Sequence, residues 1–442
     1  MKNEQKMLTR REFLNLSALG LASLTILPSY SIDGIRVAPS DRVVLGFIGL
    51  GRQGISDFYS ASKCPGVQVA AGSDVDSMKR DRLCKVVSDW QKSAGISGRC
   101  QAYESYEDLL ERKDIDAVSI ATPDHWHALT TIHACQAKKD VYCQKPLSYT
   151  ITESLAMAKA VHDNKRVLQV GSQQRSDKEF QQAIYLVQSG AIGHIDKVYA
   201  RVGPPPAPFN LPEMPIPENL NFNLWLGPLN DPVIHYHPDI CPPLSMPDMK
   251  ETGDWGAWRF YRETGNGFTA DWGAHMFDIA QAALGMDGSG PVEFIPIGYE
   301  GTKYSTMKYA NGVVMTEQPF RDDKPDDKGI CFIGDKGWIR VARGYIDCSD
   351  ASLLKKSDSE IEKGPSHAQN FIDCIRSRQK PIASVEVGCS TAILCCLVNM
   401  AHELKRPVKW NSATLSFVND KEAEAHRLYK YQYRNPYTLP CY

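Results

Sequence analysis

The sequence has almost no excess of charge of either sign: 50 Lys and Arg residues stand against 52 Asp and Glu residues in 442 positions. It also has no basic run beyond the extreme N-terminus, no internal repeat and no long low-complexity segment. A nucleic-acid-binding protein is expected to carry a basic patch, so the composition argues against that class. With 43% hydrophobic and 23% charged residues, the chain is typical of a soluble globular protein of two or three domains.

The thirteen cysteines are an odd number, and none are spaced as C-x-x-C. Buried free thiols are therefore the expectation, with one or two disulfides left open for an exported protein. A zinc site at His235, His237 and Asp239 is a minor alternative, because no Cys or Glu cluster accompanies these residues. We predict no metal.

The first forty residues do not resemble part of a folded domain. Residues 9–14 resemble a twin-arginine export signal, and residues 13–27 form a mainly apolar segment before Pro28. That segment is short for a membrane-spanning helix, which needs about 20 residues. We predict that residues 1–40 are a signal and linker and that the protein is periplasmic. An amphipathic helix in a cytoplasmic protein is the alternative. No good cleavage site follows, so retention of the segment as a membrane tether stays open.

A glycine-rich turn follows the first apolar run of the chain. Residues 41–48 are typical of a buried strand, and residues 49–54 complete the pattern G-x-G-x-x-G before a helix-like stretch. The first glycine permits a tight turn, the second lets the backbone approach a pyrophosphate, and the third lets helix and strand pack closely. We therefore expect the cofactor to contact the residues of this turn, which are Gly49, Gly51, Arg52, Gln53 and Gly54. A glycine-rich turn of an ordinary α/β domain is the alternative.

Asp74 ends the next predicted strand, residues 67–73. A carboxylate there accepts hydrogen bonds from a ribose 2′-hydroxyl and repels a 2′-phosphate. NAD is thus favoured over NADP, although Arg80 and Arg82 are close in sequence and leave NADP open.

Predicted strands and helices alternate through residues 41–172, which indicates an α/β domain with a doubly wound parallel sheet of the Rossmann type. Ligands of such sheets bind beyond the carboxyl ends of the strands, where Asp74, residues 122–127 and residues 144–145 fall. Residues 173–442 are predicted to form a second domain. In it, residues 203–217 are proline-rich and predict a long active-site loop.

A second group of polar residues follows at Asp271, His275 and Asp278. Their spacing predicts one face of a helix that runs to Leu284 and stops at Gly285. A histidine with a carboxylate one turn away can act as a general base near neutral pH. A capping aspartate and a packed histidine are the alternative.

These motifs resemble the Gfo/Idh/MocA family, the group of glucose–fructose oxidoreductase and inositol dehydrogenase. The resemblance extends to the C-terminus. It rests on residues 49–54, Asp74, Thr122 and Pro123 with His127, the triplet 144–146, and Asp271 with Gly273, His275 and Asp278. It implies that Lys145, Asp271 and His275 are catalytic, and that a large, open, mainly antiparallel sheet in the second domain supports a dimer or tetramer. Further cofactor contacts are expected at Thr122, Pro123, Trp126, His127, Gln144, Lys145 and Gln173.

One departure is Gln144, where the family usually has Glu. Glutamine removes a negative charge beside Lys145, which disfavours its protonated form. Whether this retunes the base or the cofactor site stays open. Arg175 and Arg259 are candidates for binding sugar hydroxyls, with structural ion pairs as the alternative.

Three functions compete at this point. The first is an NAD(P)-dependent oxidoreductase that acts on a carbohydrate or glycoside hydroxyl. The second resembles the family-109 NAD-dependent glycosidases, which cleave by transient C3 oxidation, elimination, water addition and re-reduction. The third is a non-catalytic sugar-binding protein. Neither the sugar nor the carbon oxidised can be read from the residues.

Overall fold

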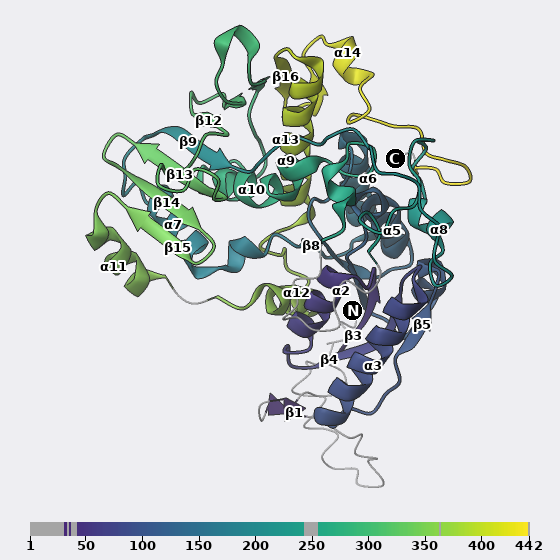
Figure 1. Cartoon of the computed structure of the whole chain (residues 1–442). Helices are drawn as coiled ribbons and strands as arrows, with labels where there is room; N and C mark the ends of the chain where they lie inside the picture. The colour runs from purple at the N-terminus through teal and green to yellow at the C-terminus, as the bar shows by residue number, and fades with distance from the viewer. Residues whose placement is uncertain (1–30, 33–34, 37–41, 243–254, 362–363, 441–442) are drawn as a thin grey trace, which may run out of the picture.

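The computed structural model describes residues 31–32, 35–36, 42–242, 255–361 and 364–440 (Figure 1). The predicted export signal lies outside these described residues and stays a prediction. The short strands β1 (Ser31–Ile32) and β2 (Ile35–Arg36) pair antiparallel ahead of the first domain.

The first domain contains six parallel strands in the order β5-β4-β3-β6-β7-β8. They are β3 (Val43–Ile48), β4 (Val67–Ser73), β5 (Gln101–Tyr103), β6 (Ala117–Ile120), β7 (Asp140–Cys143) and β8 (Leu168–Val170). The chain runs from the centre to one edge, returns, and runs to the other edge. The topological switch point therefore lies between β3 and β6, where such sheets bind their ligands. The predicted Rossmann sheet is confirmed.

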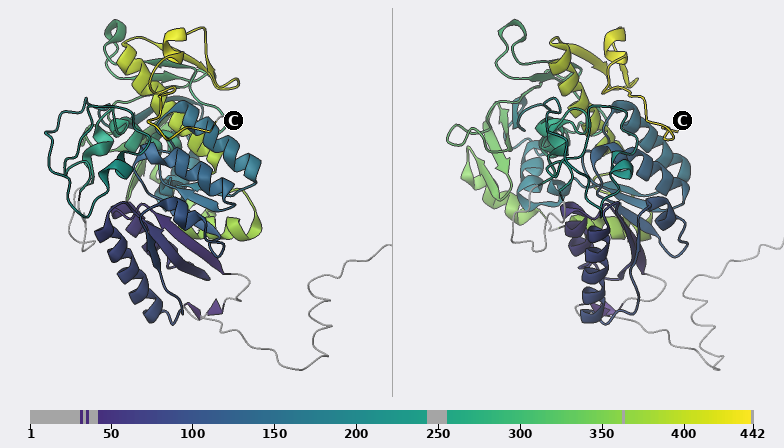
Figure 2. Two further views of the ribbon diagram at one scale, coloured as in Figure 1. Left: turned by 90° about the vertical axis from the view of Figure 1, so that its right-hand side faces the viewer. Right: turned by 45° about the vertical axis from the view of Figure 1, so that its right-hand side comes forward.

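Helices cover both faces of this sheet, which is why strands such as β6 are buried throughout. They are α2 (Arg52–Ala61), α3 (Ser77–Ser93), α4 (Tyr106–Leu110), α5 (Asp124–Gln136) and α6 (Ile151–Asn164). Helix α5 begins at Asp124, earlier than the predicted start at residue 128, because Pro123 provides the extended N-cap. The strands β3 and β4 with α2 and α3 form the lower part of the molecule (Figure 2).

The second domain is built on a nine-stranded sheet of order β15-β14-β13-β9-β12-β11-β10-β16-β17. Its strands are β9 (Ile195–Arg201), β10 (Glu293–Ile295), β11 (Thr306–Lys308), β12 (Val314–Thr316), β13 (Gly329–Gly334), β14 (Gly337–Ala342), β15 (Tyr345–Cys348), β16 (Val408–Asn411) and β17 (Ser416–Phe417). Only β9 and β12 pair in parallel among these strands. The predicted mainly antiparallel sheet is confirmed.

The helices of this domain are η3 (Gln173–Ser176), α7 (Lys178–Gln188), α8 (Phe222–Leu226), η4 (Ala257–Phe260), α9 (Gly267–Asp271), α10 (Gly273–Ala283), η5 (Tyr299–Gly301), α11 (Ala351–Glu360), α12 (His367–Ser377), α13 (Val385–Leu404) and α14 (Lys421–Glu424). The single helix predicted from Asp271 is wrong, since Asp271 ends α9 and α10 begins after Trp272. The φ of Trp272 is −95°, away from the helical value of about −63°. Gly285 does follow the end of α10, with a φ of +68° that suits a glycine.

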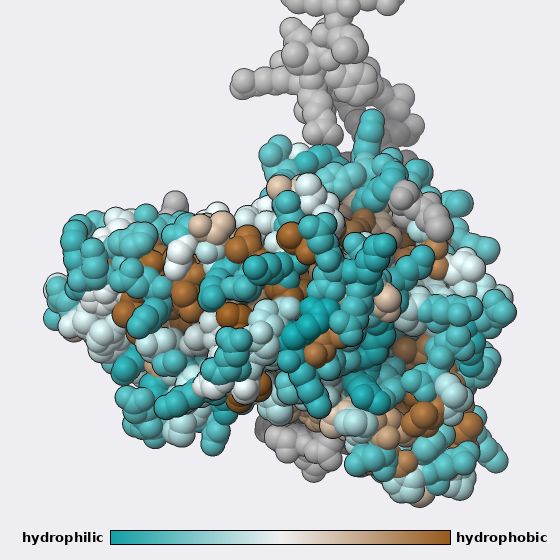
Figure 3. Space-filling model, turned by 90° about the horizontal axis from the view of Figure 1, so that it is seen from above, coloured by the Kyte–Doolittle hydropathy of each residue, from teal (hydrophilic) through white to brown (hydrophobic). Residues whose placement is uncertain are grey.

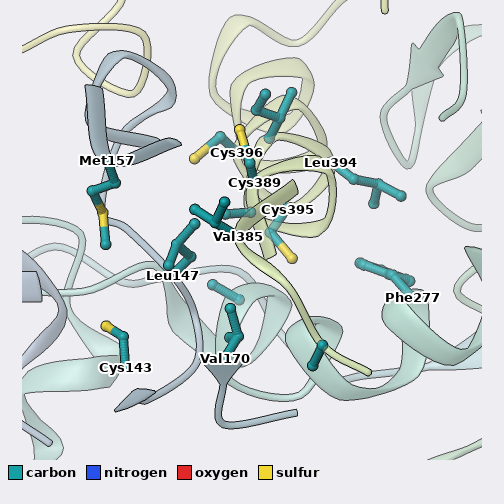
Figure 4. Close-up of a cluster of buried hydrophobic side chains, with 14 of the residues drawn as sticks. Cys143, Leu147, Met157, Val170, Phe277, Val385, Cys389, Leu394, Cys395 and Cys396 are labelled. Carbon is teal, nitrogen blue, oxygen red and sulfur yellow. The ribbon is translucent and has the colours of Figure 1, made fainter. Parts of the chain in front are cut away.

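Helix α13 joins the two domains. Its side chains contact Val170 and Leu147 of the first domain on one side and lie near Phe277 of α10 on the other (Figure 4). Gly388 is required at one contact, because a Cβ there would lie 2.5 Å from Val170 Cγ2. Helix α12 likewise returns to α2 of the first domain, far away in sequence (Figure 1).

Helix α13 is also long and apolar enough to cross a membrane by length and composition alone. Its most apolar window is 83% buried within the protein, as in a core helix. Seen from above, hydrophilic side chains cover most of the visible face and separate the apolar ones (Figure 3).

Candidate active site

A cavity of about 1050 Å³ opens at the carboxyl ends of β3, β6 and β7, and residues of the second domain close it. This volume exceeds that of most pockets for one small ligand, which are about 300–1000 Å³. Among the predicted site residues, those that line the cavity are Gly49, Gly51, Arg52, Gln53, Asp74, Thr122, Pro123, Trp126, Gln144, Lys145, Gln173, Arg259, Asp271 and His275. Gly54, His127 and Arg175 do not line it.

The glycine turn has the form that a pyrophosphate requires. Gly49 has a φ of +82°, and a Cβ at Gly54 would lie 2.0 Å from the Gly49 carbonyl oxygen. A Cβ at Gly51 would meet no atom within 4 Å, because Gly51 borders the open cavity. The turn therefore leaves space for phosphates at the N-terminus of α2.

Asp74 lies beside this turn, where its carboxylate accepts hydrogen bonds from Leu50 N (2.7 Å) and Asp76 N (3.0 Å). Each oxygen retains a lone pair for a ribose hydroxyl. Arg80 and Arg82, the candidates for a 2′-phosphate, donate instead to the carbonyl oxygens of Asp74 and Leu50. The residues present thus fit NAD.

His127 contacts the loop after β6 on the side away from the cavity. The two ring nitrogens of His127 lie 2.8 Å from Pro146 O and 3.0 Å from Thr122 O. Burial lowers the pKa of His127 to about 4, so the ring is neutral at pH 7 and donates to only one of the two carbonyl oxygens. His127 therefore packs between two loops of the wall without lining the cavity, which differs from its predicted role as a cofactor contact.

Gln144 points to Asp57 of α2. Its Nε2 lies 2.9 Å from both carboxylate oxygens of Asp57, which also accepts from Gln53 at 2.8 Å. Burial raises the pKa of Asp57 to about 7 despite these hydrogen bonds. Gln144 has no carboxylate, but its hydrogen-bond partner Asp57 supplies one beside it. The sequence did not reveal this pairing. Gln173, nearby in the wall, donates to Tyr142 Oη at 3.1 Å.

Lys145 meets Asp271 inside the cavity. Lys145 Nζ lies 2.5 Å from Asp271 Oδ1 and 3.0 Å from the Asp271 carbonyl oxygen. Although burial raises the pKa of Asp271, the charges of Lys145 and Arg259 outweigh it and hold this pKa at about 2. Asp271 is an anion that fixes Lys145 by two contacts, one from its side chain and one from its backbone.

His275 Nε2 lies 3.1 Å from a guanidinium nitrogen of Arg343, which lies in the turn between β14 and β15. Because arginine has no acceptor, Nε2 must carry the lone pair, and a neutral ring then has its proton on Nδ1. Burial and the charges of Lys145 and Arg343 lower the pKa of His275 well below its ordinary value. His275 is therefore a neutral hydrogen-bond donor, and Lys145 is the better candidate for proton transfer.

Arg259 lines the cavity, with its Nε 3.6 Å from Asp271 Oδ1. Its guanidinium stacks on Trp258 and Trp255, at 4.7 and 5.0 Å from the ring centroids. Trp255 also carries Arg52 of the glycine turn at 4.6 Å. Together with Trp272 and Phe268, these rings give this part of the cavity a mainly aromatic wall.

Arg175 is not a substrate residue. Its guanidinium is buried and forms ion pairs with Asp278 (2.7 Å) and Asp287 (2.6 Å) behind the wall. Asp278 therefore faces Arg175 and not the cavity, which corrects the shared face predicted for Asp271, His275 and Asp278.

The proline-rich segment 203–217 is also misassigned as an active-site loop, since none of its residues lines the cavity. It supports the wall from outside, where Pro204 O accepts from Phe268 N at 3.1 Å.

A metal site has no support in the described part of the chain, where no group of three or more His, Cys, Asp or Glu residues converges. His235 Nε2 lies 2.7 Å from Leu211 O, while His237 and Asp239 contact each other at 3.5 Å.

Sequence reasoning missed Asp124, the first residue of α5. Asp124 is 4% exposed and lines the same cavity. Burial raises the pKa of its carboxyl to about 8, against the opposing charges of Lys145 and Arg259. It lies within residues 122–127, which the sequence places at the carboxyl end of a strand without indicating a role for Asp124. Arg343 had no signal at all.

Comparison with known proteins identifies the chain. Residues 43–172 match the model of an oxidoreductase family with an NAD-binding Rossmann fold, GFO_IDH_MocA. Residues 206–439 match the C-terminal α/β domain of the same family. The chain belongs to the Gfo/Idh/MocA oxidoreductase family. As a member of that family it binds NAD, in agreement with Asp74 and the glycine turn.

Curated relatives of this Gfo/Idh/MocA protein match over part of their length. An uncharacterized oxidoreductase YrbE from Bacillus subtilis is 32% identical over 37% of this chain and 46% of its own. A glycosyl hydrolase family 109 protein from Shewanella pealeana is 34% identical over 33% and 35%, respectively. An inositol 2-dehydrogenase from Salmonella typhimurium is 30% identical over 35% and 44%. The chain thus spans less than half the length of these relatives.

Solved structures match the fold more completely. The WlbA dehydrogenase from Chromobacterium violaceum, in complex with NADH and UDP-GlcNAcA, has a TM-score of 0.58 at 17% identity over 88% of this chain and 99% of its own. An aldose-aldose oxidoreductase from Caulobacter crescentus has a TM-score of 0.54 at 17% identity over 83% and 99%. These likenesses show the fold alone.

Proposed function

We propose that this protein oxidises a secondary hydroxyl of a carbohydrate or glycoside. The observation that carries the proposal is Lys145, held by Asp271 in the same cavity as the glycine turn and Asp74. Bound NAD supplies a hydride acceptor there. Lys145 exchanges the hydroxyl proton, Asp271 positions Lys145, and His275 donates a hydrogen bond from Nδ1.

The wall of the cavity supports a sugar as the substrate class. Trp258, Trp272 and Phe268 line the cavity and offer apolar contacts to the C–H groups of a sugar ring, while Arg259 provides donors for hydroxyl oxygens. The named activity of an inositol 2-dehydrogenase among the curated relatives agrees with this class.

A screen tests this proposal directly. Purified protein is denatured to identify released NAD or NADH, and the native protein is mixed with a set of sugars and glycosides. We expect a keto sugar by mass spectrometry and reduction of the bound nucleotide by absorbance. Binding of sugars without either signal would instead support a non-catalytic sugar-binding protein.

A second candidate is a redox-neutral glycosidase that oxidises, eliminates, adds water and reduces again. Asp124 favours it, because a dehydrogenase needs one proton-exchanging group and this cavity holds another acid that is neutral below about pH 8. The family 109 relative agrees with it. Release of the free sugar without net change in NAD would distinguish this activity from simple oxidation.

We also propose that the protein is exported after folding, through the twin-arginine motif at residues 9–14. Every described cysteine is a free thiol, and nearly all of them are buried. This agrees with folding in a reducing compartment. NAD loaded there would have to stay bound, so we expect it to copurify at near one per subunit and to survive dialysis. Fractionation and light scattering would test the periplasmic location and the proposed homo-oligomer.

A further inference from the structure

We propose that Asp124 is the general acid that protonates the departing oxygen when a glycoside is cleaved in this cavity. The inference rests on the proposed glycosidase activity. It assigns a proton donor to the leaving oxygen, a role that Lys145, Asp271 and His275 do not fill.

Asp124 lies in the wall of the proposed active site. It follows β6 as the first residue of α5, at the switch point of the sheet, and it lines the cavity with Lys145 and Asp271. Within the described ranges, no residue donates a hydrogen bond to its carboxyl or forms an ion pair with it. A buried carboxyl without a protein partner is left with water or substrate as its partner.

The surroundings of Asp124 favour its neutral form. Lys145 beyond β7 and Arg259 in η4 favour the carboxylate, whereas burial, Asp271 in α9 and Glu153 in α6 favour the acid. Burial is the largest of these influences. The pKa of Asp271, in the same cavity, is lowered because Lys145 contacts its carboxylate directly. When two carboxyl groups in one cavity have pKa values shifted in opposite directions, the lower one indicates a fixed anion and the higher one a proton donor.

The step balances with Asp124 as the donor. In a 3-keto glycoside the carbonyl acidifies the C2 proton, and Lys145 removes it as the base after it has passed the hydroxyl proton of the oxidation step to water. The C2–H electron pair forms the C1=C2 bond, the C1–O bond breaks, and its electron pair goes to the aglycone oxygen. That oxygen takes the proton of Asp124, which leaves a free alcohol, an unsaturated ketone and the Asp124 carboxylate. Water then adds its hydroxyl to C1, and its proton returns to Asp124 while the base returns a proton to C2. Nothing is oxidised or reduced in this sequence.

Asp124→Asn tests the assignment, because the amide keeps the shape and loses the acidic proton. The assay uses glycosides of the sugar that the wild-type protein oxidises, with aglycones from simple alcohols to nitrophenols. We expect alcohol release to slow by about 10²-fold, in line with general acid catalysis. Nitrophenol release should change little, because that oxygen departs without a proton. Reduction of bound nucleotide in a single turnover should fall much less than the release of alcohols.

Three results would overturn the inference. They are an equal loss across all aglycones, an equal loss in nucleotide reduction, and a loss of bound nucleotide from the variant. The exposed Asp81 of α3 supplies a matched control, and Asp81→Asn should change none of these quantities. If the wild-type protein forms no keto sugar, the proposed function is wrong, and the role proposed for Asp124 is then wrong as well.

Infrared difference spectra of wild-type protein minus Asp124→Asn give a readout that is independent of turnover. We expect the carbonyl band of a protonated carboxyl at about pH 6 and its loss by about pH 10, on either side of the pKa of about 8. A carboxylate signal at about pH 6 would show that Asp124 has no proton to give.

Discussion

At the nucleotide end of the cavity, Leu50 meets Asp74 across 24 positions of sequence, whereas at the substrate end Lys145 meets Asp271 across 126. The first contact lies within one βαβ unit, so it forms when that unit folds. The second requires the first domain and α9 of the second domain to be docked. Binding of NAD and chemistry are therefore supported by different parts of the fold, and substitutions should separate them.

The sharpest separation is expected for Lys145→Ala. Removing the proton-exchanging group should lower turnover by about 10⁴-fold, the upper range for acid–base catalysis. The glycine turn and Asp74 hold the nucleotide elsewhere, so bound NAD should remain. Single-turnover reduction at the NADH absorbance and nucleotide content after dialysis measure the two effects. The exposed Lys85→Ala in α3 is the control. Wild-type reduction rates in Lys145→Ala would show that the substrate end is wrongly assigned.

His275→Ala should have the next largest effect, a loss of about 10²-fold in turnover. His275 is neutral throughout the working range, because its pKa is held well below the ordinary value. The pH–rate profile of the wild-type protein should therefore show no limb near pH 6.5 that His275→Ala removes. Such a limb would identify His275 as a titrating base and contradict the contact with Arg343. Asp271→Asn should cost less than Lys145→Ala, because Asp271 positions and does not transfer the proton.

These expectations also show what the sequence can reveal. Gly49 to Gly54 and Asp74 could be predicted because their chemistry follows from local spacing between strand and helix. Arg343 could not, because it reaches His275 from a β-turn 68 positions away. Gln144 was recognised as unusual, but its partner Asp57 lies 87 positions earlier and shares no motif with it. Arg175 was misassigned because an arginine in sequence looks the same whether it faces substrate or buried aspartates.

At the nucleotide end, Asp74→Ala should weaken NAD retention by about 30-fold, the value of a hydrogen bond to a charged group. Binding of NADP should fall less, because the carboxylate repels a 2′-phosphate. Asp74→Asn is the matched control, since its amide oxygen still accepts from Leu50 N. Calorimetry with both nucleotides measures the difference. An equal loss of affinity for NAD and NADP would show that Asp74 does not bind the ribose 2′-hydroxyl.

The smallest effect, and the one that joins the two ends, is expected for Gln144→Glu. The new carboxylate would face Asp57, which Gln144 now satisfies with two hydrogen bonds. Losing donors to a buried charged group costs about 2 kcal/mol in the free energy of unfolding.

The pH dependence of this cost follows from Asp57. Burial raises its pKa from 3.8 unfolded to about 7 folded, so the folded state binds more protons. Its contribution to stability is present below the unfolded value and is lost as the pH rises through 7. Gln144→Glu should therefore destabilise the protein more at about pH 8 than at about pH 5, where one carboxyl can donate to the other.

Thermal unfolding at the two pH values measures this difference in stability. Asp57→Asn combined with Gln144→Glu should recover most of the loss, because the new amide at position 57 can donate to the new carboxylate at position 144. If Gln144→Glu is as stable as wild type at both pH values, Gln144 does not serve Asp57. The glutamine would then have to be explained from the side of Lys145, as the charge removed beside the proton-exchanging group.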